Sequence, residues 1–371
     1  MFRHAEYKEK DELYSIWRKI FADSQSFASW FFSERFVPYY TAVWEEGGRI
    51  ACVSHALPVH VRVRGAILPA ALIAGVATLP EYRGRGIMRA TLAAQMRHLR
   101  ELGIPLVVHR PENFAIYRSL CHYPVADKAF LTLPSTAPRP MMPSGYVATI
   151  IEPESALDVL YSLYSRASQL YGSCMARSFA DFALKYRDYA ADGVNCAVAY
   201  YEGEAIGYAF YSQTTPDIEC PEVMAKDKMA YDALVAYIAS IAEGDVTFAL
   251  PPDAYAPDGL PAGAKLNVAP RTAGCITDVR AVLRALNKEG LTLEVIDPSV
   301  PQNSGVFDIS GEPSSAPAKL RLDVGRLAQI AFGYASASGL SEEGLIETES
   351  GAAAELDQLL PPQSCYFIDE Y

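Results

Sequence analysis

The stretch VATLPEYRGRGIMRATL, residues 76–92, holds the residue types whose spacing best suits chemistry. It places Arg83, Gly84, Arg85 and Gly86 between an apolar strand-like run and a helix-like run. The first backbone N–H groups of a helix have no intrahelical partner and carry the positive end of the helix dipole, so they bind anions. Glycine lets the backbone approach phosphate oxygens, and arginine adds charge and forked donors. The stretch therefore predicts a pyrophosphate-binding loop.

Two familiar phosphate loops do not fit this stretch. A Walker loop requires Gly-Lys-Ser/Thr, which does not follow here, and this stretch does not contain the G-x-G-x-x-G pattern of a dinucleotide loop. The remaining alternative is an exposed basic turn that opens a helix and binds nothing.

The elements that must position the loop are indicated by the periodicity of the apolar residues. Spacings of three and four predict an amphipathic helix over residues 9–22 and a second helix over residues 27–36. Short β-rich runs over residues 39–80 predict an antiparallel meander, and its last strand, which ends at Leu79, is apolar on both faces and therefore central. A helix after Gly86, a strand over IPLVVHR and a short helix over ENFAIYRSLCHY complete this region.

The rest of the chain divides into two further segments. Residues 134–143 contain four prolines without periodicity and predict a linker, and DPSVPQNSG predicts a second boundary. The middle third repeats the order of elements of the first but lacks the arginine-glycine loop. The last segment is expected to hold strands over residues 291–296 and 318–323 and then a helix from Val324. The ending SCYFIDEY is too aromatic for a frayed tail, so we expect it to dock.

Length and charge limit the class of protein. A chain of 371 residues exceeds the size of one core, so two or three domains are expected. The net charge of −12 argues against a nucleic-acid partner and would attract a cationic substrate. No apolar run approaches the ~18 residues of a membrane helix, and the N-terminus lacks the core of a signal peptide, so we expect a cytoplasmic protein without a membrane partner.

The cysteines and histidines do not indicate a metal site. The seven cysteines are dispersed and never form C-x-x-C, so neither a disulfide framework nor a zinc cage is predicted, and we expect them reduced and buried. His55, His60 and His109 lie on strand-like runs without metal-ligand spacing and are interpreted as core or surface residues.

The arginine-glycine loop resembles the acyl-coenzyme A signature of the GNAT N-acetyltransferase superfamily, R-x-x-G-x-G/A, with Arg83 first and Gly86 as the first glycine. Met88 stands in the last place, and R-x-x-G-[Ile/Leu]-[Met/Leu]-Arg resembles the enhanced intracellular survival (Eis) family, which acetylates amines on aminoglycosides. The resemblance implies acetyl-CoA as the acyl donor and no metal. The residues that it implies for acetyl-CoA binding are Val76, Ala77, Thr78, Arg83, Gly84, Arg85, Gly86 and Ile87.

The resemblance also implies a fold. Eis-like proteins are near this length and combine two GNAT folds, with mixed central sheets flanked by helices, and a sterol-carrier-protein-like α+β domain. This chain would then have a catalytic GNAT domain over residues 1–133, a GNAT-like domain without the coenzyme signature over 144–290, and the third domain over 291–371. Eis relatives form hexamers, so the resemblance implies a homo-oligomer, a hexamer or a trimer of dimers.

The reacting groups are likewise implied by resemblance. AIYRSLCHYP resembles the Eis-family segment whose tyrosine protonates the coenzyme A thiolate, and Tyr117 aligns with that tyrosine, while Cys121 and His122 replace the usual glycine and aromatic. The family's base is its C-terminal carboxylate, here that of Tyr371. The substrate-binding residues would be Asp369 and Glu370, for ammonium groups, and Trp30 and Phe31, which with Trp17 would line the pocket mouth.

The function expected on these grounds is direct acetyl transfer, in a ternary complex, from acetyl-CoA to a primary amine of a cationic acceptor such as an aminoglycoside or polyamine. Two rivals stay open. One is acetylation of protein lysines or N-termini, and the other is a non-catalytic coenzyme A- or lipid-binding scaffold.

Overall fold

The computed structural model describes residues 1–214, 216–256 and 259–370. The chain forms two compact units. The first unit joins Met1–Ala126, Gly172–Ala176 and Arg271–Tyr371, and the second joins Asp127–Tyr171 and Arg177–Pro270. Segments from both ends of the sequence therefore fold in one unit. The domain boundaries expected at residues 133–144 and 290–291 stay predictions.

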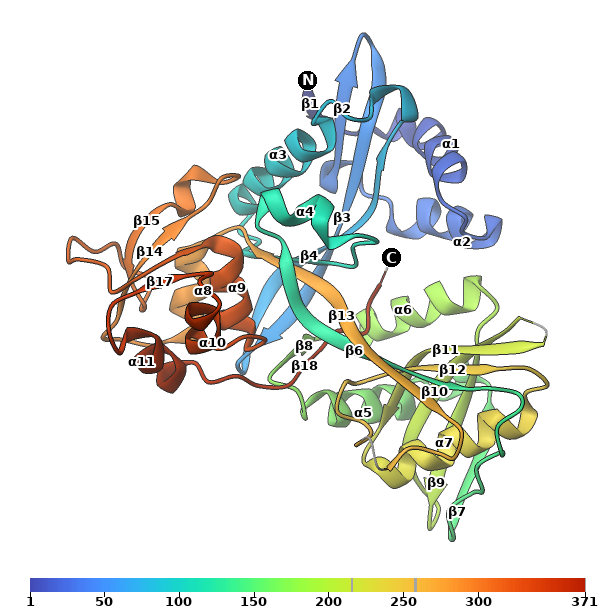
Figure 1. Ribbon diagram of the computed structural model, residues 1–371. Coiled ribbons are helices and arrows are strands. Elements are labelled where there is room, and N and C mark those ends of the chain that lie inside the picture. The colour runs from blue at the N-terminus through green and yellow to red at the C-terminus, as the bar shows by residue number, and fades with distance from the viewer. Residues whose placement is uncertain (215, 257–258, 371) are drawn as a thin grey trace. The chain divides into compact units, whose positions relative to one another are not determined.

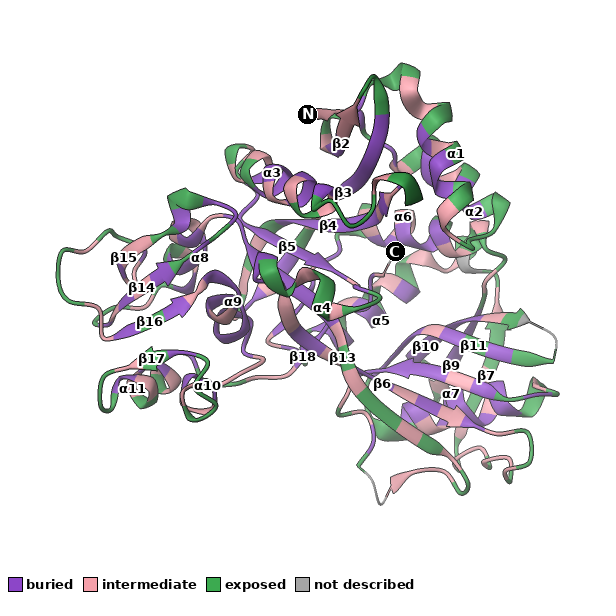
Figure 2. Ribbon diagram, turned by 45° about the horizontal axis from the view of Figure 1, so that its top comes forward, coloured by how far each residue is buried: buried purple, intermediate pink, exposed green. Residues whose placement is uncertain are grey.

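The first unit is built on a mixed sheet. Its strands follow the order β1 (Phe2–His4), β2 (Thr41–Glu46), β3 (Arg49–Val63), β4 (Ala66–Thr78), β5 (Leu106–His109) and β13 (Lys265–Ile276), of which the part from Arg271 belongs to this unit. All neighbours are antiparallel except β4 and β5, which run parallel. The predicted meander and its central last strand are confirmed, and Figure 2 shows β4 and β5 buried over most of their length.

Helices cover both faces of this sheet, which is why β4 is apolar on both sides. On one face lie α1 (Lys10–Ile20), α2 (Gln25–Trp30) and a π turn (Phe31–Arg35), and on the other lies α3 (Ile87–Glu101) (Figure 1). α1 buries Leu13, Ile16 and Trp17 at the predicted helical spacing. α4 (Phe114–Tyr117) follows β5. The helices predicted for residues 9–22 and after Gly86 are thus confirmed.

A second, smaller sheet lies in the C-terminal part of the same unit. It runs in the order β15 (Gly305–Asp308), β14 (Thr292–Ile296), β16 (Leu320–Asp323) and β17 (Glu347–Thr348), with helices α8 (Val279–Leu286), α9 (Val324–Phe332), α10 (Ala337–Glu342) and α11 (Ala352–Leu359). The two predicted strands and the helix from Val324 are confirmed.

The end of the chain docks as predicted over residues 365–370. β18 (Cys365–Tyr366) pairs with β8 (Ser173–Met175), which pairs in turn with β3. Tyr366, Phe367 and Ile368 are buried, so the aromatic character of this segment reflects packing in the core of the first unit.

The second unit also has a mixed sheet with helices. Its strands follow the order β6 (Tyr123–Leu133), β12 (Val246–Leu250), β11 (Asp217–Ala225), β10 (Glu204–Thr214), β9 (Asn195–Tyr201) and β7 (Tyr146–Ile151), and its helices are α5 (Leu157–Ser168), α6 (Phe179–Ala191) and α7 (Lys228–Ile241). The hairpin between β9 and β10 turns at Glu202 and Gly203, both in the left-handed region. The predicted class, mixed sheets flanked by helices, is confirmed.

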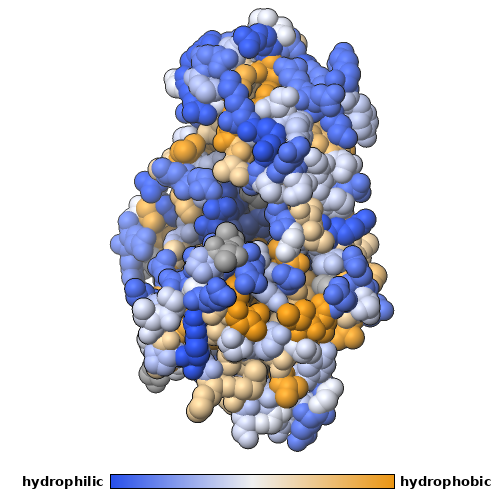
Figure 3. Space-filling model, turned by 90° about the vertical axis from the view of Figure 1, so that its right-hand side faces the viewer, coloured by the Kyte–Doolittle hydropathy of each residue, from blue (hydrophilic) through white to orange (hydrophobic). Residues whose placement is uncertain are grey.

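Two general features bear on the class of protein. On the face seen in Figure 3, hydrophilic side chains predominate and apolar ones gather in separate patches, as befits a chain of net charge −12. None of the helices within residues 1–214, 216–256 and 259–370 combines the length and the apolar character needed to cross a bilayer. All seven cysteines are buried, as expected, and none of them forms a disulfide with another described residue.

Candidate active site

The site begins where β4 and β5 part. Their parallel ladder ends at the pair Ile73 and His109, but β4 continues to Thr78. At that point the register between β3 and β4 shifts, because Gly75 and Val76 form a bulge. Gly75 has φ +56°, which favours glycine. Beyond Ile73 no described strand pairs with this edge of β4, so its backbone N–H groups can bind a ligand.

The loop between β4 and α3 leaves room for an anion. Gly84 and Gly86 have φ of +74° and +73°, and a Cβ at either position would meet no atom within 4 Å. Gly86 is the N-cap of α3 and supplies no capping side chain, so the first N–H groups of the helix stay available to a ligand. Buried Gln95 fixes α3 to the sheet, since its amide accepts from Ser54 Oγ at 2.7 Å.

A cavity of about 430 Å³ lies against this loop. Seven of the eight residues expected to bind acetyl-CoA line it: Val76, Ala77, Thr78, Arg83, Gly84, Gly86 and Ile87. Arg83 is oriented by a bond from its Nε to Thr78 O at 3.0 Å. Arg85, the eighth, instead forms an ion pair with Glu46 at 2.7 Å. Tyr117 lines the same cavity, as does Ile116.

A second cavity of about 430 Å³ adjoins the first, because Val76, Ile116 and Tyr117 line both. Trp17 and Phe21 give it aromatic walls. We call these two spaces the loop cavity and the aromatic cavity.

The charges of the aromatic cavity come from short segments around its walls. Asp23 follows α1 and accepts a hydrogen bond from Trp17 Nε1 at 2.8 Å. Glu112 lies between β5 and α4, and its carboxylate is 2.9 Å from Arg110. His109, the last residue of β5, also lines this cavity. The sequence reasoning missed Asp23 and interpreted His109 as a core or surface residue, since nothing in the local pattern indicates where either lies.

Tyr117 ends the short helix α4 at the junction of the two cavities. Asn113 is the N-cap of this helix, and its Oδ1 accepts a hydrogen bond from the backbone N–H of Ala115 at 2.9 Å. The Tyr117 ring packs against His109, with centroids 4.6 Å apart. Burial, with smaller contributions from Cys52 and Glu112, raises the pKa of Tyr117 to about 12, so the phenol is protonated at neutral pH. A half-buried, protonated phenol can donate its proton in a reaction.

Of the three aromatic residues expected at the pocket mouth, Trp17 lines the aromatic cavity, whereas Trp30 and Phe31 lie in the core beside it. Phe31 is fully buried and packs against Trp17, with ring centroids 4.5 Å apart. Trp30 is half-buried against the same core. Neither is among the residues that line the two cavities. The aromatic walls come from Trp17, which lies on α1, and from Phe21, which follows the end of α1 one helical turn later. Phe31 packs against the ring of Trp17.

The C-terminal segment reaches the same region through one carboxylate. Glu370 accepts three hydrogen bonds from Arg271 and lies 3.5 Å from Arg110, which lines the aromatic cavity. Asp369 is buried. Both side chains are thus engaged inside the first unit. The predicted base, the carboxylate of Tyr371, lies outside the described residues.

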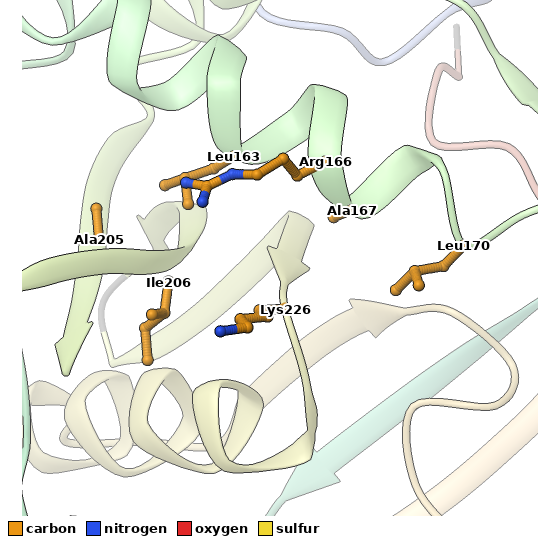
Figure 4. A pocket seen from close by; sticks show the side chains of 7 residues that line it. All are labelled: Leu163, Arg166, Ala167, Leu170, Ala205, Ile206 and Lys226. Atoms are coloured by element: carbon orange, nitrogen blue, oxygen red, sulfur yellow. The ribbon is translucent and has the colours of Figure 1, made fainter.

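The second unit offers a different kind of pocket. Its cavity of about 140 Å³ is lined by Leu163, Arg166, Ala167, Leu170, Ala205, Ile206 and Lys226 (Figure 4). Figure 4 shows these side chains between α5 and the strands below it. Arg166 forms an ion pair with Glu204 at 3.1 Å, and no glycine of an arginine-glycine loop lines the space. The features that suit a diphosphate are therefore found in the loop cavity.

Comparison with known families agrees with this division. Residues 1–122 match the family described as acetyltransferase (GNAT) domain, and residues 279–368 match the sterol carrier protein domain. No protein of curated function matches the chain.

Solved structures share the fold over the full length. A conserved protein of Enterococcus faecalis V583, described as a probable N-acyltransferase, is 21% identical with a TM-score of 0.84, covering 100% of this chain and 99% of that one. A GCN5-related N-acetyltransferase from Anabaena variabilis is 19% identical with a TM-score of 0.84, and Eis1 from Mycobacterium abscessus is 19% identical with a TM-score of 0.78; both alignments cover 100% of each chain.

The matched GNAT domain supports an acyltransferase enzyme. A GNAT domain takes an acyl-CoA donor and an acceptor, and the loop cavity with its helix N-terminus lies in the matched residues 1–122. This match argues against a purely non-catalytic scaffold. The chain therefore contains a GNAT acetyltransferase domain and a C-terminal sterol carrier protein domain, and its fold is similar to that of Eis1.

Proposed function

We propose that this enzyme transfers the acetyl group of acetyl-CoA to a primary amine of a cationic acceptor, such as an aminoglycoside or a polyamine, directly within a ternary complex. The observation that carries the proposal is the junction of two unlike cavities at Val76, Ile116 and Tyr117. One cavity suits a diphosphate-bearing donor, and the other suits an aromatic-bound cation.

The donor fits the loop cavity through backbone groups. The N-terminus of α3 and the glycines at 84 and 86 would hold the diphosphate, and Arg83 would add charge. The unpaired edge of β4 at Val76 to Thr78 would run beside the pantetheine arm and donate to the thioester oxygen. Arg85, paired with Glu46, has no assigned contact with the donor.

The acceptor fits the aromatic cavity through charge and ring faces. Asp23 and Glu112 contribute two carboxylates, and the one guanidinium, Arg110, is turned to Glu112 and Glu370. Trp17 and Phe21 present aromatic faces, which attract cations electrostatically. The net charge of −12 would raise the local concentration of a polycation.

The chemistry then needs three proton movements. One ammonium group of the acceptor first loses a proton to solvent, and the resulting neutral amine attacks the thioester carbon. The carbonyl oxygen becomes an oxyanion held by N–H groups of β4, and the oxyanion then collapses as the C–S bond breaks. The Tyr117 hydroxyl gives its proton to the departing thiolate, and its raised pKa keeps that proton in place beforehand. The carboxylate of Tyr371 would take the proton from the new amide nitrogen. The ion pair of Glu370 beside Arg110 supports delivery of the chain's end to this cavity.

A covalent acyl-cysteine has no suitable nucleophile here. Burial raises the pKa of the Cys52 and Cys121 thiols, that of Cys121 to about 12. A protonated, buried thiol is a poor nucleophile, which favours direct transfer.

An amine screen tests the proposal. Release of coenzyme A thiol from acetyl-CoA would be followed with aminoglycosides, polyamines and lysine peptides as acceptors. Turnover is expected to depend on the polycationic amines, whereas turnover with peptides alone would favour a protein acetyltransferase. Tyr117→Phe and deletion of Tyr371 should each lower kcat while leaving acetyl-CoA affinity within about two-fold, and Tyr7→Phe, at an exposed position, is the matched control. Full activity in both site variants would refute the assigned roles.

Two further expectations remain. The family resemblance implies a homo-oligomer, a hexamer or trimer of dimers, which light scattering would measure. We also propose a cytoplasmic location, which fractionation of the producing cells would test.

A further inference from the structure

A hydrogen-bonded pair of histidines lies directly behind Tyr117. His109 Nε2 and His122 Nδ1 are 2.9 Å apart, and the two rings meet edge to face with centroids 5.0 Å apart. Both side chains are buried, at 3% and 1% exposed. The pair joins the end of β5 to the turn that follows α4, and Tyr117 is the last residue of α4.

Tyr117 is held by this pair at two places. Its ring packs on His109, with centroids 4.6 Å apart, and lies nearly parallel to the His122 ring, with an interplanar angle of 25° and a centroid distance of 6.2 Å. The backbone N–H of His122 donates to the Tyr117 carbonyl at 3.3 Å. Because α4 has only four residues, its own hydrogen bonds hold Tyr117 weakly. The histidine pair therefore supplies much of the restraint on the tyrosine.

Both histidines are neutral at physiological pH. Burial lowers the pKa of His109, with a smaller contribution from His122, and burial lowers the pKa of His122 to about 4. Two facing neutral imidazoles share one hydrogen, so one ring donates and the other accepts. His122 Nε2 is buried and has no hydrogen-bond partner among the described residues. An orphan N–H is rarer than an orphan acceptor, which favours His122 Nδ1–H as the donor to His109 Nε2.

We infer that His109 and His122 form a neutral hydrogen-bonded pair that positions Tyr117 for proton donation to the departing thiolate, with His122 as a positioning residue that acts through His109. The inference rests on the proposed function, because it assigns a support to the tyrosine that the proposal makes the acid. Proton transfer needs the phenol oxygen within hydrogen-bond reach of the sulfur, so a small displacement of the ring lowers the rate of the chemical step more than donor binding.

The test uses two substitutions of His122 that differ in hydrogen bonding. His122→Phe keeps a ring but removes the donor to His109, and we expect kcat to fall at least five-fold while KM for acetyl-CoA changes less than two-fold. His122→Asn places an amide N–H near the position of Nδ1 and should restore kcat to within about two-fold of wild type. Thermal unfolding of each variant reports whether the fold is kept.

A double-mutant cycle separates the possible outcomes. In a Tyr117→Phe background, His122→Phe should lower kcat less than two-fold, because the residue that His122 positions no longer has a hydroxyl proton to donate. An equal loss in both backgrounds, or wild-type kcat in His122→Phe while Tyr117→Phe is slow, would overturn the inference and leave the acid role intact. Wild-type kcat in Tyr117→Phe would overturn the acid role and the inference with it.

A second pair of variants keeps the test decisive if His122→Phe does not fold. His109→Gln keeps a polar group near the position of Nε2, and His109→Leu removes it. We expect the glutamine variant to retain at least five-fold more kcat than the leucine variant at saturating acceptor. Equal values of kcat would overturn the inference.

Discussion

Gly75 lines the aromatic cavity at a position where an added methyl group would meet the ring of Trp17. A Cβ at this residue would lie 2.2 Å from Cζ3 of Trp17 and 3.0 Å from the His55 ring. Its φ of +56° adds the strain of a left-handed backbone, which costs about 1–2 kcal/mol for a residue with a Cβ. The indole of Trp17 is buried and cannot swing into solvent, so the contact adds overpacking of about 1–3 kcal/mol.

Gly75→Ala should therefore lower the free energy of unfolding by about 2–5 kcal/mol. The displaced indole would lose its bond to Asp23, so KM for the acceptor should rise several-fold while KM for acetyl-CoA stays within two-fold. Gly103→Ala is the matched control, because Gly103 has φ +71° but open space at its Cβ, and should cost only the strain. Urea unfolding and steady-state kinetics measure both effects. If the two variants lose the same stability, the contact with Trp17 is not a constraint and the reasoning fails.

Three further predictions follow from charges. Burial lowers the pKa of His55 to about 3 and that of His122 to about 4, below the unfolded value of about 6.5. The unfolded chain therefore binds more protons, and the free energy of unfolding falls as the pH drops below 6.5, by about 1.4 kcal/mol per pH unit for each residue. Urea unfolding between pH 7.5 and 5 should show this slope, and His122→Asn should reduce it. Arg271→Met removes the three hydrogen bonds from Arg271 to Glu370 and leaves the weaker ion pair with Arg110, so it should lower kcat with little effect on KM for acetyl-CoA, whereas unchanged kcat would remove the C-terminal segment from the mechanism. Arg83→Ala should raise KM for acetyl-CoA at least five-fold and Arg85→Ala less than two-fold, since only the former lines the loop cavity; equal effects would contradict that difference.

The parts of the site that sequence could predict are those set by local chemistry. The change of periodicity at Gly86, from alternation to helical spacing, marks the N-terminus of α3, and the two glycines have the positive φ that a tight anion loop needs. The same local logic predicted the central strand before the loop and the docked aromatic end of the chain. These features depend on neighbours in the sequence, which one chain displays in full.

The parts that sequence did not predict depend on contacts between distant residues. Asp23 and His109 meet the same cavity because α1 packs on the face of the sheet at β4, while β5 is the strand that pairs with β4. Arg85 looks equivalent to Arg83 in the loop, but Glu46, nearly forty residues earlier, binds it. The bulge at Gly75 is visible only in the register between β3 and β4, and single residues do not reveal strand register.

The two cavities offer different kinds of groups to a ligand, main-chain groups in one and side chains in the other, and this has an evolutionary consequence. The loop cavity offers mainly main-chain N–H groups and glycine space, which survive most substitutions nearby, whereas the aromatic cavity is made of individual side chains such as Trp17, Asp23 and Glu112. Mutations can therefore retune which amine is accepted without loss of the donor. Under the proposed function, proteins that keep this fold could therefore differ in the amine that they accept while they use the same class of acyl donor.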